Sequence, residues 1–86
     1  MSDNKTTIIF VINGHDQEEV VNVHEPLAVA RKKALHDSEN TSRPAEEWGI
    51  YTEDGKELMN VDAKIETFHF PNPLRLTLTL KVGAGG

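Results

Sequence analysis

The last apolar segment constrains the fold more than any other feature of the sequence. Leucine stands at every second position from Leu74 to Leu80, alternating with Arg and Thr, and the segment continues to Val82. Such alternation puts one set of side chains on each face of a β-strand. We therefore expect residues 74–82 to form a strand with one buried and one wet face, which must pack on a core supplied by the rest of the chain.

The first apolar segment predicts a second, more central strand. Residues 7–12 are rich in β-branched residues and apolar at consecutive positions, as in strands that are covered on both faces. Asn13-Gly14 follows directly, and both residues tolerate the positive φ of a tight hairpin turn. Residues 19–23 then supply the return strand, with Val21 and Val23 on one face. The chain is thus predicted to open with a β-hairpin.

A helix is expected between residues 26 and 37. Pro26 suits a first helical turn because its fixed φ is helical and it has no N–H to leave unpaired. The apolar residues recur at i, i+3, i+7 and i+8, which forms one stripe, and they are Leu27, Ala30, Ala34 and Leu35. Arg31 lies beside this stripe, and we interpret the basic cluster Arg31, Lys32 and Lys33 as a solvated helix face.

The remaining segments complete a mixed sheet. Residues 48–51 predict a third strand with Trp48 in or beside the core, Asp54-Gly55 a second hairpin turn, and residues 56–59 a fourth strand. Residues 62–68 predict a short helical turn. The long last strand must then lie parallel to the first. The expected fold class is α+β, with a mixed five-stranded sheet wrapped around one helix.

Length and composition restrict the function. With 86 residues, we expect one domain over residues 7–82, a flexible arm at 1–6 and a flexible tail at 83–86. The net charge of −5 argues against nucleic-acid binding, which needs clustered cations, and suits a basic partner. The absence of cysteine excludes disulfides, thiolate metal sites and a cysteine nucleophile. We expect a cytoplasmic location and no membrane span.

Other polar residues do not suggest a catalytic or metal site. The four histidines fall one to a segment, without the close spacing of metal ligands, and they are His15, His24, His36 and His69. The acidic pairs Glu18-Glu19 and Glu46-Glu47 are interpreted as solvated faces or edge charges that discourage strand pairing. No metal site and no enzymatic activity are expected.

Taken together, the two hairpins, the helix and the leucine strand resemble the ubiquitin-like β-grasp family along nearly the whole chain. The features that carry the resemblance are the hairpin at Asn13-Gly14, the segments 21–26 and 27–35, the Asp54-Gly55 turn, residues 62–68, and the strand that runs into Gly85-Gly86. More narrowly, the chain resembles bacterial multiubiquitin domains, which occur beside activating and conjugating enzymes. It differs from ubiquitin in lacking an arginine-rich tail.

This resemblance implies that the chain is a substrate of other enzymes. The Gly86 carboxylate would be adenylated by an E1-like activating enzyme, which uses ATP and magnesium, and passed through an E2-like conjugating enzyme to a target protein or other acceptor. A deconjugating peptidase would reverse the reaction. Glycine fits a narrow channel because it has no Cβ. Gly85 and Gly86 would therefore pass through such a channel in the activating enzyme. The enzyme would recognise the tail residues Val82, Gly83 and Ala84. The chain itself would bind no cofactor.

Two other functions remain open. Small β-grasp sulfur carriers also end in Gly-Gly and hold a thiocarboxylate there, and a non-covalent adaptor would not use the tail.

In this family the outer sheet face docks partners. Either Ile8, Phe10 and Ile12 or Ile9 and Val11 face the helix, and the other set lies outside. The candidate partner surface is Ile8 and Phe10 together with Thr77 and Thr79, which are polar where the last strand of ubiquitin offers an apolar patch.

Overall fold

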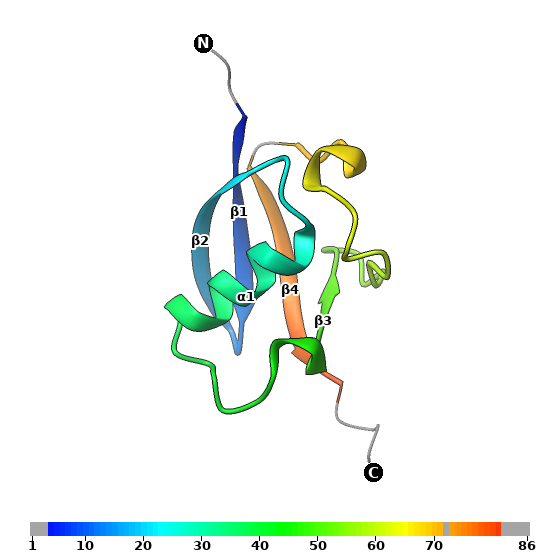
Figure 1. The fold of residues 1–86 in the computed structure, drawn as a ribbon. Helices are drawn as coiled ribbons and strands as arrows, with labels where there is room; N and C mark the ends of the chain where they lie inside the picture. The colour runs from blue at the N-terminus through cyan, green and yellow to red at the C-terminus, as the bar shows by residue number, and fades with distance from the viewer. Residues whose placement is uncertain (1–3, 72, 82–86) are drawn as a thin grey trace.

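The computed structural model describes residues 4–71 and 73–81. Four strands, one α-helix and two short 3-10 helices follow one another in this part of the chain (Figure 1). In order they are β1 (Lys5–Ile12), β2 (His15–Asn22), α1 (Leu27–Asp37), η1 (Ala45–Glu47), β3 (Trp48–Tyr51), η2 (Ile65–Phe68) and β4 (Leu74–Leu80).

The four strands form one mixed sheet in the order β2-β1-β4-β3. The central strands β1 and β4 are parallel, with Ile8 beside Leu74 and Ile12 beside Leu78. The pairs β1–β2 and β3–β4 are antiparallel. Helix α1 crosses one face of this sheet (Figure 1). The α+β class, the parallel central pair and the β-grasp arrangement predicted from the sequence are therefore confirmed.

The first hairpin turns within two residues, as the Asn-Gly pair predicts. Asn13 and Gly14 have φ of 54° and 81°, which matches the twist of the flanking strands. Ile12 therefore pairs directly with His15. As a result β2 begins at His15 rather than at residue 19. Strand β1 likewise begins at Lys5, ahead of the predicted start at residue 7.

The strand predicted at residues 56–59, the fourth of five, is wrong. Residues 56–59 contact β3 through an isolated bridge between Tyr51 and Glu57 and through the Leu58 N–H, which donates to the Ile50 carbonyl at 2.8 Å. The chain then reverses, because the Val61 N–H donates to the Met59 carbonyl at 3.0 Å. The ladder ends before a second regular pair can form, so the sheet has four strands.

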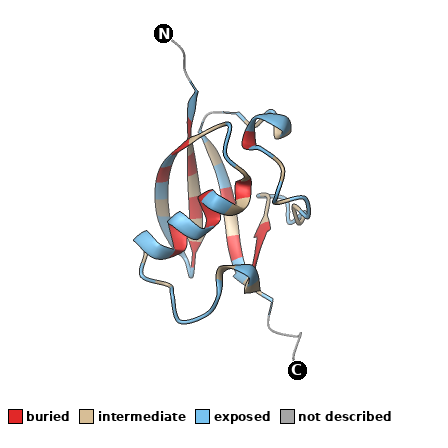
Figure 2. Ribbon diagram, viewed as in Figure 1, coloured by how far each residue is buried: buried red, intermediate tan, exposed pale blue. Residues whose placement is uncertain are grey.

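The core lies between α1 and the inner face of the sheet (Figure 2). Leu76 and Leu78 are buried as predicted, and so is Trp48. The predicted helical stripe also faces the sheet. The fully or nearly fully buried apolar residues are Ile8, Phe10, Ile12, Val21, Leu27, Ala30, Ala34, Leu35, Trp48, Ile50, Ile65, Leu76 and Leu78.

Helix α1 begins directly after Pro26, as predicted, but its basic cluster is split. Lys32 and Lys33 are exposed, whereas Arg31 retains only 8% of its exposure. The interpretation of Arg31 as part of a solvated face is therefore wrong. It lies one turn after Leu27 on the side that faces β3, where its Nη1 donates to the Trp48 carbonyl at 2.9 Å.

Candidate functional site

The predicted reactive residues follow β4 directly in the sequence. The conjugating residues Gly85 and Gly86 and the recognition residues Val82, Gly83 and Ala84 lie outside the described residues. Their roles stay predictions. What the structure does give is the position of Lys81, the last described residue before them, which comes directly after the central strand β4.

Lys81 is held through both its backbone and its side chain. Its N–H donates to the Glu47 carbonyl of η1 at 2.8 Å. Its ammonium group lies 2.7 Å from the Glu57 carboxylate. These contacts tie the end of β4 to η1 on one side and to the segment after β3 on the other. The residue that precedes the glycine-rich segment therefore has a defined place on the domain.

A glycine next to Lys81 makes room for this arrangement. Gly49 pairs with Thr79 across β3 and β4. A Cβ at Gly49 would lie 2.8 Å from the Tyr51 ring and 3.0 Å from the Lys81 Cε, closer than carbon atoms normally approach. The absence of a side chain at this position thus lets the Tyr51 ring and the Lys81 stem lie over the strand.

The outer face of the sheet contains only part of the predicted partner surface. Thr77 and Thr79 lie on it, but Ile8 and Phe10 are 0% exposed and face α1. Their assignment to a partner surface is therefore wrong. The residues of β1 that share the outer face with Thr77 are Ile9 and Val11, which are half-buried. Tyr51 joins the same face, because it pairs with Thr77.

An ion pair crosses this outer face. The Arg75 guanidinium donates to both carboxylate oxygens of Asp16, at 2.9 and 3.1 Å, and lies 3.8 Å from the Glu53 carboxylate. Because β1 separates β2 from β4, the Arg75–Asp16 pair spans β1. The outer face is thus a mixed surface of half-buried aliphatic residues under charged side chains.

Two of the four histidines lie beside carboxylates. His24 lies 3.4 Å from Glu66 and His36 lies 3.6 Å from Asp37, both on the surface. In residues 4–71 and 73–81, no three His, Asp or Glu side chains come together as metal ligands would. The helices in the same residues are all too short or too polar to cross a lipid bilayer.

One signal in the sequence could have identified the outer residues of β1. A two-residue turn at Asn13-Gly14 pairs Ile12 with His15, and this register places Ile8 opposite Glu19 and Thr6 opposite Val21. Paired residues point to the same face. Val21 and Val23 were expected on one face of the return strand; if that apolar face is taken as the buried one, the even-numbered residues of β1 lie on the buried face as well. No comparable signal in the sequence places Tyr51 or Arg75 on the outer face, because their positions depend on the β1–β4 register.

Solved structures similar to this one share its fold. The ubiquitin-like domain of the Arabidopsis thaliana protein At2g32350 superposes with a TM-score of 0.73 and 19% identity, over 93% of this chain and 81% of that chain. The ubiquitin of Caldiarchaeum subterraneum superposes with a TM-score of 0.70 and 15% identity, over 88% of this chain and 92% of that one. At these identities the likeness shows the fold alone.

A closer sequence relative occurs in Sinorhizobium fredii (strain NBRC 101917 / NGR234). It is named uncharacterized protein y4jI and is 42% identical over 82 residues, which are 95% of this chain. The match spans 62% of the relative, so the relative is a longer protein. A family profile matches residues 1–86. The chain therefore belongs to the family described as Protein of Unknown function (DUF2604), and its fold is the ubiquitin-like β-grasp.

Proposed function

We propose that the chain is a ubiquitin-like modifier and that the Gly86 carboxylate is its reactive group. A carboxylate oxygen would attack the α-phosphorus of ATP on an activating enzyme, with release of pyrophosphate. A cysteine thiol would then displace AMP to give a thioester, which a conjugating enzyme passes to an amine of the target. The chain supplies no catalytic group and binds no cofactor; ATP and magnesium belong to the activating enzyme.

The arrangement around Lys81 carries this proposal. A modifier must present its end at a fixed place on a stable domain while leaving that end free to enter an enzyme. Here Lys81, the last described residue before Val82-Gly83-Ala84-Gly85-Gly86, directly follows the central strand β4 and is tied to Glu47 and Glu57. The segment that follows supplies the two terminal glycines, which have no Cβ and so would fit a narrow channel in the activating enzyme.

The longer length of the relative in Sinorhizobium fits a variant of the same scheme. Where residues follow the second glycine in a precursor, a peptidase has to expose the Gly86 carboxylate before activation. We place these reactions in the cytoplasm, where ATP is available. The same peptidase activity would release the modifier from its targets.

Trypsin gives a direct test. An N-terminally tagged protein is incubated with an extract of the cells that encode it, with and without ATP and magnesium, and the adducts are digested. Trypsin cleaves after Lys81, so an acceptor lysine would retain residues 82–86 as a branched remnant. We expect this remnant only with ATP. A Gly86 that has exchanged one oxygen for sulfur would instead indicate a sulfur carrier.

A graded set of tail variants provides the controls. Deletion of Gly86 should abolish the adducts because the shortened tail no longer brings its carboxylate to the reacting phosphate. Gly85→Val should also abolish them and Gly85→Ala should reduce them, because the two side chains add different bulk in the narrow channel expected in the enzyme. Thermal unfolding should be the same for all three, since none changes the core. If the protein without Gly86 still forms adducts, the proposal is wrong and a non-covalent adaptor role follows.

A further inference from the structure

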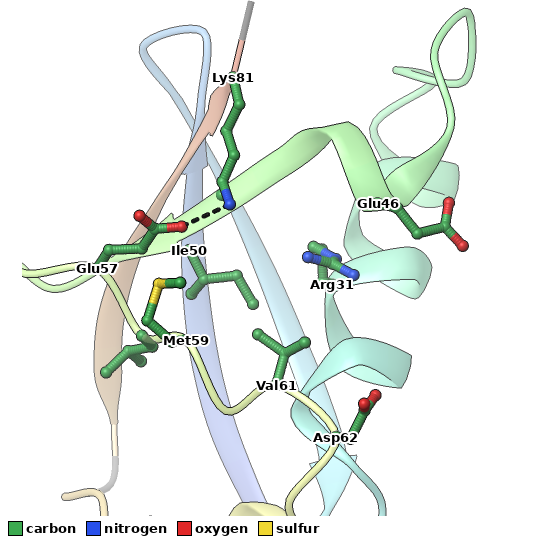
Figure 3. Close-up of a pocket in the computed structure, with 10 residues that line it drawn as sticks. Arg31, Glu46, Ile50, Glu57, Met59, Val61, Asp62 and Lys81 are labelled. Atoms are coloured by element: carbon green, nitrogen blue, oxygen red, sulfur yellow. Dashed lines mark ion pairs between the residues drawn. The ribbon is translucent and has the colours of Figure 1, made fainter. Parts of the chain in front are cut away.

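A hollow of about 270 Å³ opens between α1, β3 and the segment of residues 57–62 (Figure 3). Its apolar wall consists of Ile50, Leu58, Met59 and Val61. Met59 is the most exposed of these, with 73% of its surface accessible. Small-molecule sites usually measure roughly 300–1,000 Å³, so this hollow suits a single side chain better than a whole ligand.

Arg31 lines this hollow and lacks partners for most of its guanidinium. The side chain is more than nine-tenths buried. The Trp48 carbonyl is its only hydrogen-bond acceptor among the described residues, and its Nε is buried without any acceptor. Burial lowers the pKa of Arg31, while Glu46 and Asp62 act in the opposite direction. A buried guanidinium with one bond is costly, so an additional acceptor would stabilise it.

The rim of the hollow carries more acid than base. Lys81 and Glu57 neutralise each other at 2.7 Å. Glu46 and Asp62 are exposed, and neither forms an ion pair within residues 4–71 and 73–81. Figure 3 shows Glu46 to one side of the Arg31 guanidinium and Asp62 below it, with Val61 facing it. Two unpaired carboxylates around one buried cation would repel an anionic ligand and attract a cationic one.

We propose that this hollow binds a lysine or arginine side chain of a partner protein. The aliphatic stem would lie on Val61 and on Met59, whose flexible side chain can adapt to it. The cation would sit at the mouth between Glu46 and Asp62. A neutral backbone carbonyl of the same partner segment would accept a hydrogen bond from the Arg31 guanidinium.

Four observations select this occupant over others. The acceptor that Arg31 lacks has to be neutral, because the rim already holds an excess of carboxylate. The unpaired carboxylates require a cation, and the apolar wall requires a stem between the two. The whole chain is acidic, at a net charge of −5, which favours a basic partner surface through long-range attraction. This inference is independent of the tail chemistry, since it needs neither Gly85 nor Gly86.

A short peptide tests the proposal. The probe is acetyl-Ala-Lys-Ala-amide, titrated into the isotope-labelled full chain and followed by NMR up to about 10 mM, because a single side chain gives affinities near the millimolar range. We expect shifts at the Arg31 Nε–H and the Met59 methyl group. The matched peptide with norleucine, which lacks the charge, should bind at least about threefold more weakly. The matched peptide with glutamate should not bind.

Rim variants supply the second arm. Glu46→Gln and Asp62→Asn should each weaken binding of the lysine peptide about two- to fivefold, as expected for exposed charges. Glu18→Gln removes the same charge from the outer sheet face and should leave binding unchanged. Thermal unfolding should be unaffected in all three. Equal binding of the lysine and norleucine peptides, preference for the glutamate peptide, or no shift at Arg31 would overturn the proposal.

Discussion

The inner and outer faces of the sheet differ in how many polar side chains they carry and where these lie. The inner face is apolar over its centre, and its buried polar residues, Thr6 and Glu19, lie towards its β2 side. The outer face is mixed throughout, with Ile9 and Val11 half-buried beneath the Arg75–Asp16 ion pair. This contrast shows that one sheet can exclude water on one side while keeping a surface on the other that is neither core nor fully hydrated.

The largest expected effect is on the inner face. Leu76 is fully buried next to Phe10. Leu76→Ala should lower the free energy of unfolding by about 2–5 kcal/mol, since it removes apolar contacts and leaves a cavity. Chemical denaturation measures this change. An effect below about 1 kcal/mol would mean that the inner face is loosely packed.

A smaller effect is expected where the inner face meets its charged margin. Glu19 is 3% exposed; burial raises its pKa above 4.5, as do the hydrogen bond and the charge of Asp37. Between pH 4.5 and the raised pKa, the folded state binds more protons than the unfolded state. Stability should therefore fall as pH rises through this window.

Glu19→Gln should remove this part of the pH dependence. The free energy of unfolding, measured by denaturation from about pH 4 to pH 8, should then change less with pH than in the parent protein. Lys33, which lies 3.9 Å from Glu19, and Gln17, which donates to it at 3.1 Å, are retained in both proteins. Identical pH profiles would show that Glu19 ionises as it does in water.

On the outer face, Gly49 marks one tightly packed place. Gly49→Ala would place a Cβ against the Tyr51 ring. Because that ring can rotate away, the free energy of unfolding should fall only modestly. In a Tyr51→Ala background the same substitution should be less costly by about 0.5–1 kcal/mol. A double-mutant cycle in denaturant measures this coupling. Additive effects would show that Tyr51 does not lie over the glycine.

The smallest effect is expected for Thr77→Ala. Thr77 is half-buried on the outer face, between Val11 and Tyr51 in the sheet. Its substitution should change the free energy of unfolding by less than about 0.5 kcal/mol. Measured beside Leu76→Ala, it compares two adjacent residues on opposite faces. Similar costs at both positions would remove the distinction between the faces.

Local signals in the sequence predict the elements and most of the core. The Asn13-Gly14 turn, the helix after Pro26 and the alternating leucines each depend on neighbouring residues, and all three are found as expected. The strand at residues 56–59 is wrong because its continuation depends on where the chain reverses. That reversal is made by the hydrogen bond from the Val61 N–H to the Met59 carbonyl. No residue type in this segment predicts a turn there.

Predicting which residues form the surfaces requires the relative positions of elements that are distant in the sequence. The burial of Arg31 requires knowing that the Trp48 carbonyl lies opposite the helix, which depends on the position of β3 beside β4. The assignment of Ile8 and Phe10 to the outer face failed because the segment is apolar on both faces, so its orientation follows only from its register with β2. Glu46, Met59 and Asp62 come together around Arg31 only in the folded chain.

The parallel alignment of β1 and β4 also determines how the domain resists force. A pull applied at Lys5 and at Leu80 would act along the two central strands in opposite directions. The hydrogen bonds of the ladder from Ile8 to Ile12 are evenly spaced along this pair, so they would bear the load together instead of opening one at a time. Unfolding by a translocating motor that pulls on one strand against the other should consequently be slow compared with opening of the antiparallel β1–β2 hairpin from its free edge.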